Sequence, residues 1–104
     1  MEKLSNLLPS VLQLDPKWKR SGYTAISNKI LFRADVSVGA KVVYWYLLIR
    51  CFTKDYSYPS YETIAKDLRV GRASVARYIV ELKEKHLVEV KHRRNKSNLY
   101  FLKT

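Results

Sequence analysis

The stretch SYETIAKDLRVGRASVARYIVELKEK, residues 60–85, holds two helical patterns that only a short break separates. Ser60 is a natural N-cap for the first pattern, in which apolar residues follow at helical spacing. They are Tyr61, Ile64, Ala65 and Leu68. After residues 69–71, a second pattern runs from Arg72 to about Lys85, and its inner stripe is Val75, Ile79 and Leu82. Two helices joined by so short a turn must cross at a steep angle, which is the geometry of a helix-turn-helix.

A longer apolar pattern precedes this pair of helices. It starts after Ser37, a natural N-cap, and apolar residues recur every three or four positions. They are Ala40, Val43, Tyr44, Leu47, Leu48 and Cys51. We therefore expect a third helix, buried along one face, followed by a polar loop over residues 53–59. Cys51 is the only cysteine, and its place in the stripe predicts a small core residue rather than a nucleophile.

The two ends of the chain differ in character. Residues 87–92 alternate apolar and polar, residues 99–102 are β-type, and the stretch between them is basic, which predicts a β-hairpin. The fold class predicted is α+β, mainly α: a winged helix-turn-helix with a three-helix core and a C-terminal hairpin wing. A short strand is also expected over residues 23–26.

Residues 1–22 form an N-terminal extension, and residues 23–104 form the predicted DNA-binding domain. The extension carries apolar residues at helical spacing, interrupted by Pro9, and then a basic connector from residue 15 onward. The apolar residues are Leu4, Leu7, Leu8, Val11 and Leu12. Two roles stay open for this segment: a flap that covers the domain, or a docking element for another chain.

The composition narrows the function. Lys and Arg number 20 against 9 Asp and Glu, a net charge of +11, which favours a polyanionic partner, with nucleic acid ahead of a membrane surface. We find no paired carboxylates, no nucleophile beside a base, no glycine-rich phosphate loop and no metal-ligand spacing. We therefore expect no enzyme activity, no cofactor and no metal. The sequence shows neither a membrane-spanning stretch nor a signal peptide, which predicts a cytoplasmic protein.

The helix over residues 72–85 is the predicted recognition helix. If its apolar stripe faces the core, a rotation of about 100° per residue places Ala73, Ala76, Arg77 and Val80 outward. Arg72 and Ser74 then lie at the flanks of its first turn. The candidate contacts are Arg72, Ala73, Ser74, Ala76 and Arg77. The small residues would let the helix axis approach the groove floor, while Arg77 could read guanine and Arg72 a base or a phosphate. Glu81 and Glu84 are expected to point away from the groove.

The hairpin tip supplies a second basic cluster. Its candidate contacts to the DNA backbone or minor groove are Lys91, Arg93, Arg94, Asn95 and Lys96. Asn98 is interpreted instead as a turn former. Ahead of the first helix of the pair, Tyr58, Ser60 and Tyr61 are candidates for contacts to a phosphate.

The sequence also resembles a known family. Residues 31–48 and 58–68, the run LKEKHLV at 82–88 and the closing NLYFL at 98–102 resemble winged helix-turn-helix domains of bacterial, phage and plasmid proteins. Two positions depart from that pattern. Gly71 stands where the family has Ser or Thr as helix cap, and His86 stands where it has Gly.

The resemblance implies double-stranded DNA as partner, in replication initiation or in transcription regulation of a mobile element. The oligomeric state stays open, although a two-fold homodimer would double the site, because one recognition helix covers only a few base pairs. The alternative is an adaptor that binds proteins through its N-terminal apolar segment. Membrane association is not expected, because the basic residues do not lie opposite a large apolar stripe.

Overall fold

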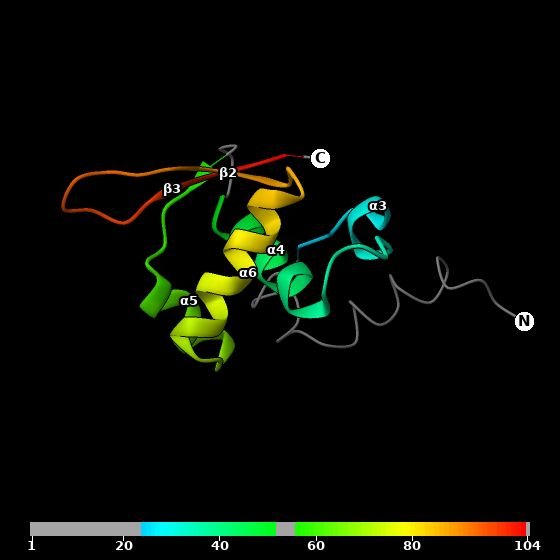
Figure 1. Ribbon diagram of the computed structural model, residues 1–104, viewed down its shortest axis with the longest axis horizontal. Coiled ribbons are helices and arrows are strands. Elements are labelled where there is room, and N and C mark those ends of the chain that lie inside the picture. Colours follow the sequence, from blue (N-terminus) through cyan, green and yellow to red (C-terminus); the bar gives the residue numbers. More distant parts are fainter. Residues whose placement is uncertain (1–23, 52–55, 104) are drawn as a thin grey trace, which may run out of the picture.

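A computed structural model describes residues 24–51 and 56–103 of the chain. In chain order the elements are α3 (Asn28–Leu31), α4 (Val38–Cys51), β1 (Tyr56–Ser57), α5 (Tyr61–Leu68), α6 (Arg72–Glu84), β2 (Val88–Lys91) and β3 (Leu99–Leu102). Helices α4, α5 and α6 pack together, and the β2–β3 hairpin reaches away from them as a wing (Figure 1). The predicted fold class, a winged helix-turn-helix, is confirmed.

The predicted caps set where the helices begin. The Ser37 hydroxyl oxygen accepts a hydrogen bond from the Ala40 N–H at 3.2 Å, and the Ser60 hydroxyl oxygen accepts one from the Thr63 N–H at 3.1 Å. At the start of α6, Gly71 is the N-cap, with φ −70° and no side-chain hydrogen bond. The boundaries expected at Ser37 and Ser60 are confirmed, and α6 starts without a capping side chain.

The turn between α5 and α6 depends on Arg69. This residue caps α5 in the left-handed conformation, with φ 56°, and the next N–H, of Val70, donates to the Ala65 carbonyl. Left-handed backbone is uncommon for a residue with a side chain. The left-handed residue of this turn is therefore Arg69, whereas Gly71, with φ −70°, is extended.

The core lies where α4, α5 and α6 meet the sheet. All three apolar stripes predicted from the sequence contribute to it, and Cys51 is buried as expected. Helices α4 and α6 approach closely at Gly39, where an added Cβ would overlap the Tyr78 ring. Tyr46, outside the predicted stripe, is also buried, and its hydroxyl donates to the Asp67 carboxylate of α5 at 2.5 Å. Burial first, and this hydrogen bond second, raise the pKa of Tyr46 to about 12.

The wing is an antiparallel hairpin, as predicted. Val88 pairs with Leu102 and Lys91 with Leu99. Before it, His86 adopts φ 59° directly after α6, so it takes the left-handed position that glycine holds in the resembling family. The Tyr44 hydroxyl donates to the Lys103 carbonyl at 2.9 Å, which ties the end of β3 to α4.

Two expectations about secondary structure were wrong. Thr24–Ser27 form no strand, because Ser27 caps the short helix α3 and the Trp45 indole N–H binds the Thr24 carbonyl at 2.7 Å; Tyr23 lies outside the described residues. The segment expected as a polar loop contains β1, which pairs with β3 and makes the sheet three-stranded, in the order β1-β3-β2. The Tyr56 ring packs on Phe101, with centroids 5.4 Å apart. The sequence did not predict this strand because it is only two residues long and lies in a polar stretch.

Glu81 of α6 holds the start of α4. Its carboxylate accepts from the Ser37 N–H at 2.6 Å and from the Ser37 hydroxyl at 2.7 Å. We expect Glu81→Ala to lower the free energy of unfolding by about 1–2 kcal/mol, because two charge-assisted hydrogen bonds disappear. Urea unfolding followed by circular dichroism measures this loss. Glu84→Ala, one helical turn further at an exposed position, is the control, and an equal effect in both variants would contradict a specific role of Glu81.

Candidate nucleic-acid interface

The outward side of α6 is small and cationic over its first half. Arg72, Ala73 and Arg77 are exposed, while Ser74 and Ala76 are partly buried. The first turn of this helix contains no acidic residue. Arg77 donates to the Ser74 hydroxyl oxygen at 3.1 Å, which holds its guanidinium beside the N-terminal half of the helix. Of the five candidate residues, Ala73 and Arg77 thus face away from the buried stripe, Ser74 and Ala76 lie beside it, and Arg72 stands at its exposed N-terminal end.

An acidic residue of α5 reaches this surface. The Glu62 carboxylate pairs with the Arg72 guanidinium at 3.3 Å, and both side chains are about two-thirds exposed (66% and 65%). Exposed ion pairs of this kind add little stability. The pair therefore acts on the position and charge of Arg72 more than on the fold.

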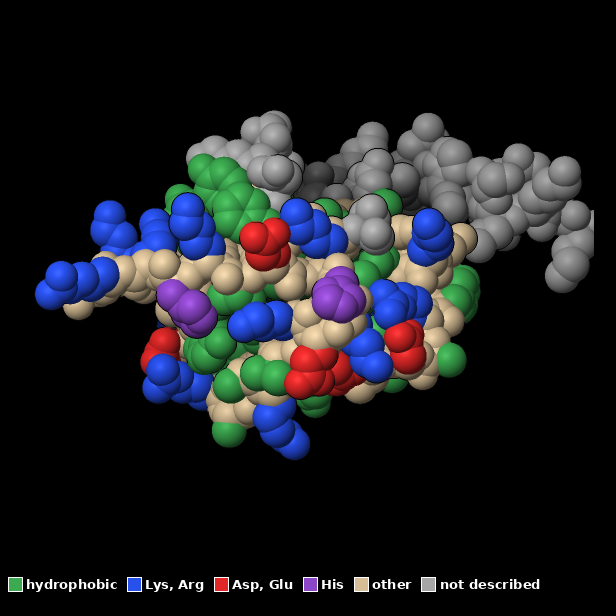
Figure 2. All heavy atoms as spheres, turned by 45° about the horizontal axis from the view of Figure 1, so that its top comes forward, with side chains coloured by type: hydrophobic (Ala, Val, Ile, Leu, Met, Phe, Trp, Pro, Cys, Tyr) green, Lys and Arg blue, Asp and Glu red, His purple; other side chains and the backbone are tan. Residues whose placement is uncertain are grey.

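The wing tip carries exposed cations. Lys91 ends β2, and Arg94 and Lys96 lie in the connection to β3; all three are exposed. Figure 2 shows the blue Lys and Arg side chains along the hairpin and at its far end. Asn95 makes the turn, with φ 58°, whereas the Asn98 side-chain oxygen accepts a hydrogen bond from the His92 Nδ1–H across the hairpin at 3.1 Å. The turn former is thus Asn95 rather than Asn98.

Arg93 ties the connection between β2 and β3 to the segment before α5. Its Nε–H donates to the Ser97 carbonyl at 2.8 Å, and its guanidinium lies 5.6 Å from the centre of the Tyr58 ring. The Ser97 hydroxyl in turn donates to the Tyr58 carbonyl at 2.5 Å. These contacts fasten the wing to the segment before α5. Arg93 was predicted together with Arg94, but the two side chains lie in different environments.

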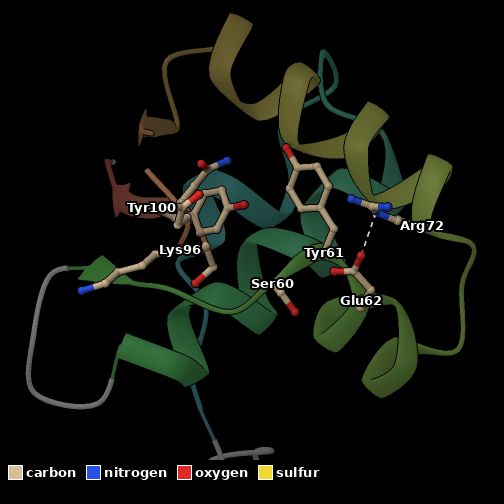
Figure 3. Close-up of a pocket in the computed structure, with 9 residues that line it drawn as sticks. Ser60, Tyr61, Glu62, Arg72, Lys96 and Tyr100 are labelled. Carbon is tan, nitrogen blue, oxygen red and sulfur yellow. Dashed lines mark ion pairs between the residues drawn. The ribbon is translucent and has the colours of Figure 1, made fainter. Parts of the chain in front are cut away.

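A pocket of about 460 Å³ separates the wing from the helix pair. It is lined by Ser60, Tyr61, Glu62, Arg72, Asn95, Lys96, Ser97, Asn98 and Tyr100. In Figure 3, Lys96 from the wing lies on one side and the Glu62–Arg72 pair on the other, with Tyr61 and Tyr100 between them. Burial raises the pKa of Tyr100, so its phenol remains a neutral hydrogen-bonding group at physiological pH. The pocket thus joins residues from both basic clusters.

The candidate phosphate contacts before α5 have different positions. The Ser60 hydroxyl is engaged in capping α5, where it also shares a hydrogen bond with the Thr63 hydroxyl at 2.9 Å. Tyr61 lines the pocket, and Tyr58 is 56% exposed beneath Arg93. Ser60 and Tyr61 thus lie at the pocket, while Tyr58 lies against the connection between β2 and β3.

Sequence reasoning missed four residues that line the pocket: Glu62, Ser97, Asn98 and Tyr100. Glu62 precedes Arg72 by ten positions, and only the crossing of α5 and α6 brings the two together. Within the described residues, we find no group of three or more potential metal ligands and no helix long and apolar enough to cross a bilayer.

Comparison with known proteins identifies the family. Residues 36–88 match the model of a helix-turn-helix domain. No curated protein shows significant sequence similarity to the chain. Among solved structures, a mutant of Lactococcus lactis ZitR in complex with DNA is similar over 97% of this chain and 66% of its own, with 16% identity and a TM-score of 0.51. A second ZitR mutant is similar over 99% of this chain and 67% of its own, with 14% identity and a TM-score of 0.49.

The family match spans α4, α5 and α6 and reaches the first residue of β2. The likeness to the DNA complex of ZitR shows the same overall fold, and this chain spans about two thirds (66%) of that protein. The sequence resemblance to winged helix-turn-helix proteins is thus confirmed for the family and the fold. The chain belongs to the helix-turn-helix domain family, in its winged form.

Proposed function

We propose that this protein binds double-stranded DNA, with α6 in the major groove and the wing on the backbone or in the minor groove. Helix-turn-helix domains bind DNA through the second helix of the pair. Family membership supports DNA binding and argues against an enzyme. DNA of a chromosome, plasmid or phage would be met in the cytoplasm.

One observation carries the proposal: the two basic clusters border the same pocket. Arg72 reaches it from α6, and Lys96 reaches it from the wing. A helix of this width fits the major groove, and cations on either side can contact the flanking phosphates. Arg77, Arg94 and Lys91 extend the positive surface in both directions. A charge distribution of this kind supports a polyanionic ligand that spans helix and wing.

The proposal is tested with a pool of randomised duplexes at several salt concentrations. Sequencing the duplexes retained at the highest salt separates base readout from phosphate binding. We expect one motif to be enriched, and an inverted repeat within it would support a two-fold dimer. Retention without enrichment would reduce the proposal to phosphate binding alone. A lack of retention even at low salt would overturn it.

For the biological role, we propose transcription regulation, with replication initiation of a mobile element as the alternative. The resemblance to bacterial, phage and plasmid domains supports both roles. The position of the recovered motif in the source genome distinguishes them. Sites beside promoters would support regulation, and a cluster of repeats at an origin would support initiation.

Glu62 is expected to restrain binding to unrelated sequences. Its carboxylate lies 3.3 Å from the Arg72 guanidinium and would repel a nearby phosphate. Glu62→Gln should therefore raise the affinity for scrambled duplexes several-fold and lower the preference for the selected motif. Fluorescence anisotropy with both duplexes measures the ratio. Glu84→Gln removes the same charge far from the pocket, and a matching gain in that variant would assign the effect to net charge alone.

A further inference from the structure

Helix α4 carries a second apolar stripe on the side opposite the core. Val38, Val42, Trp45 and Ile49 follow at intervals of four, three and four residues, so a rotation of about 100° per residue places them on one line. Val38 is 76% exposed, Val42 42% and Ile49 46%. Trp45 is partly buried. The core residues of the helix, such as Leu47, lie about half a turn away.

This stripe requires a cover. A helix that is apolar on both sides is typical of one that is buried on both sides. A continuous apolar surface of this kind usually marks a contact with another element or chain. Helix α6 packs on α4, and none of the stripe residues lines the pocket between helix and wing. DNA bound at α6 and the wing would leave the stripe free.

The N-terminal extension matches the stripe in chemistry and length. Its apolar residues, all outside the described residues, lie between positions 4 and 14. A helical segment of that length spans about 15 Å, and the stripe from Val38 to Ile49 spans about 16 Å at the same rise of 1.5 Å per residue. Pro9 is compatible with two short helical pieces, since proline is favoured in a first turn.

The point of attachment also lies at the stripe. The Trp45 indole N–H donates to the Thr24 carbonyl at 2.7 Å, which fixes the first described residue beside the middle of α4. Residues 15–23 connect this point to the apolar segment and reach at most about 30 Å when extended. The segment can therefore lie along the whole stripe of its own chain.

We propose that residues 4–14 pack on this stripe in the same chain and complete the domain. A tethered segment acts at an effective concentration of about millimolar, whereas a second copy at micromolar concentration must also lose translational and rotational freedom. The intramolecular contact is thus favoured over a swapped one. In this intramolecular contact, the apolar residues of the extension would be covered and could not bind another protein. This proposal does not depend on DNA binding.

Paired cysteines test the contact and identify the occupant. In a Cys51→Ala background, Val42→Cys is combined in turn with Leu4→Cys, Leu8→Cys or Leu12→Cys, so that one badly oriented pair does not decide the result. Mild oxidation of the full chain should give an intrachain disulfide and a monomeric mass in at least one pair. Glu84→Cys with Leu8→Cys is the control and should not cross-link. A covalent dimer would assign the stripe to a second copy, and free thiols in all pairs would rule out docking; either result overturns the proposal.

Tryptophan fluorescence gives a second, independent test. The chain has two tryptophans, and Trp18→Phe leaves Trp45 as the only one, which excitation at the red edge of the absorption band selects over the tyrosines. In that background, replacing Leu7 and Leu8 with serine should shift the emission of Trp45 to longer wavelength and strengthen its quenching by iodide. Ser5→Ala with Ser10→Ala, which leaves the apolar residues intact, should have no effect. Unchanged emission and quenching in the leucine variant would overturn the proposal.

Discussion

Replacing Arg72 and Arg77 together with alanine is expected to lower the affinity for the selected DNA motif by at least about 100-fold, since each bidentate contact to a base is worth about 1–3 kcal/mol. Both side chains are exposed on the N-terminal half of α6. Their contacts to Glu62 and Ser74 lie at the surface, so the fold should be retained. Titration of labelled duplex, with circular dichroism of the free variant, measures both quantities.

The matched control for this variant removes two positive charges elsewhere. Lys29 of α3 and Lys83 near the end of α6 are exposed and do not line the pocket between helix and wing. Lys29→Ala with Lys83→Ala should weaken binding only slightly and equally for motif and scrambled duplex. If this control loses as much affinity as the arginine variant, binding follows net charge and α6 is not the recognition helix.

The second large effect is expected at the wing tip. Arg94→Ala with Lys96→Ala should reduce the slope of log affinity against log salt by about 1.8, because each lost phosphate contact accounts for about 0.9. The affinity should fall roughly tenfold for motif and scrambled duplex alike, since phosphate contacts carry no sequence information. Binding isotherms at four or more salt concentrations give the slope. An unaltered slope would show that the tip does not contact the backbone.

Arg93 is expected to behave differently from its neighbours at the tip. Its guanidinium holds the Ser97 carbonyl at 2.8 Å and lies against Tyr58. Arg93→Lys retains the charge but loses the planar fork that makes these contacts. It should leave the salt slope unchanged and weaken binding through a less ordered wing. Hydrogen exchange of residues 91–99 would detect that loss of order, and a reduced slope would instead make Arg93 a phosphate contact.

Much of the fold could be predicted because local patterns agree with the tertiary structure. Helices α4 and α5 begin at the serines that cap them, and α6 keeps its apolar stripe over its whole length. The strand β1 could not be predicted, because two residues between polar neighbours carry no period, and only pairing with β3 defines them. The left-handed conformation of Arg69 could not be predicted either, because an arginine carries no preference for a positive φ.

The sequence predicted which cationic residues belong to the candidate interface, but not which residues they contact. Exposure of Arg77 follows from helical periodicity, whereas Arg72 lies three residues before the buried Val75 and is exposed because it is the first residue of α6. The partners of these arginines, Glu62 for Arg72 and Ser97 for Arg93, lie in other parts of the fold, so the spacing of residues in the sequence does not predict them. Glu81 shows the same limit: its position on α6 suggested only that it points away from DNA, whereas it caps α4 through Ser37.

The most direct test of the proposed binding mode is a backbone NMR titration of the protein with the selected duplex. We expect the largest chemical-shift changes at residues 72–77 of α6 and 91–98 of the wing, with α4 from Val38 to Ile49 unaffected. Changes confined to the outward stripe of α4, or spread evenly over the domain, would contradict recognition through helix and wing.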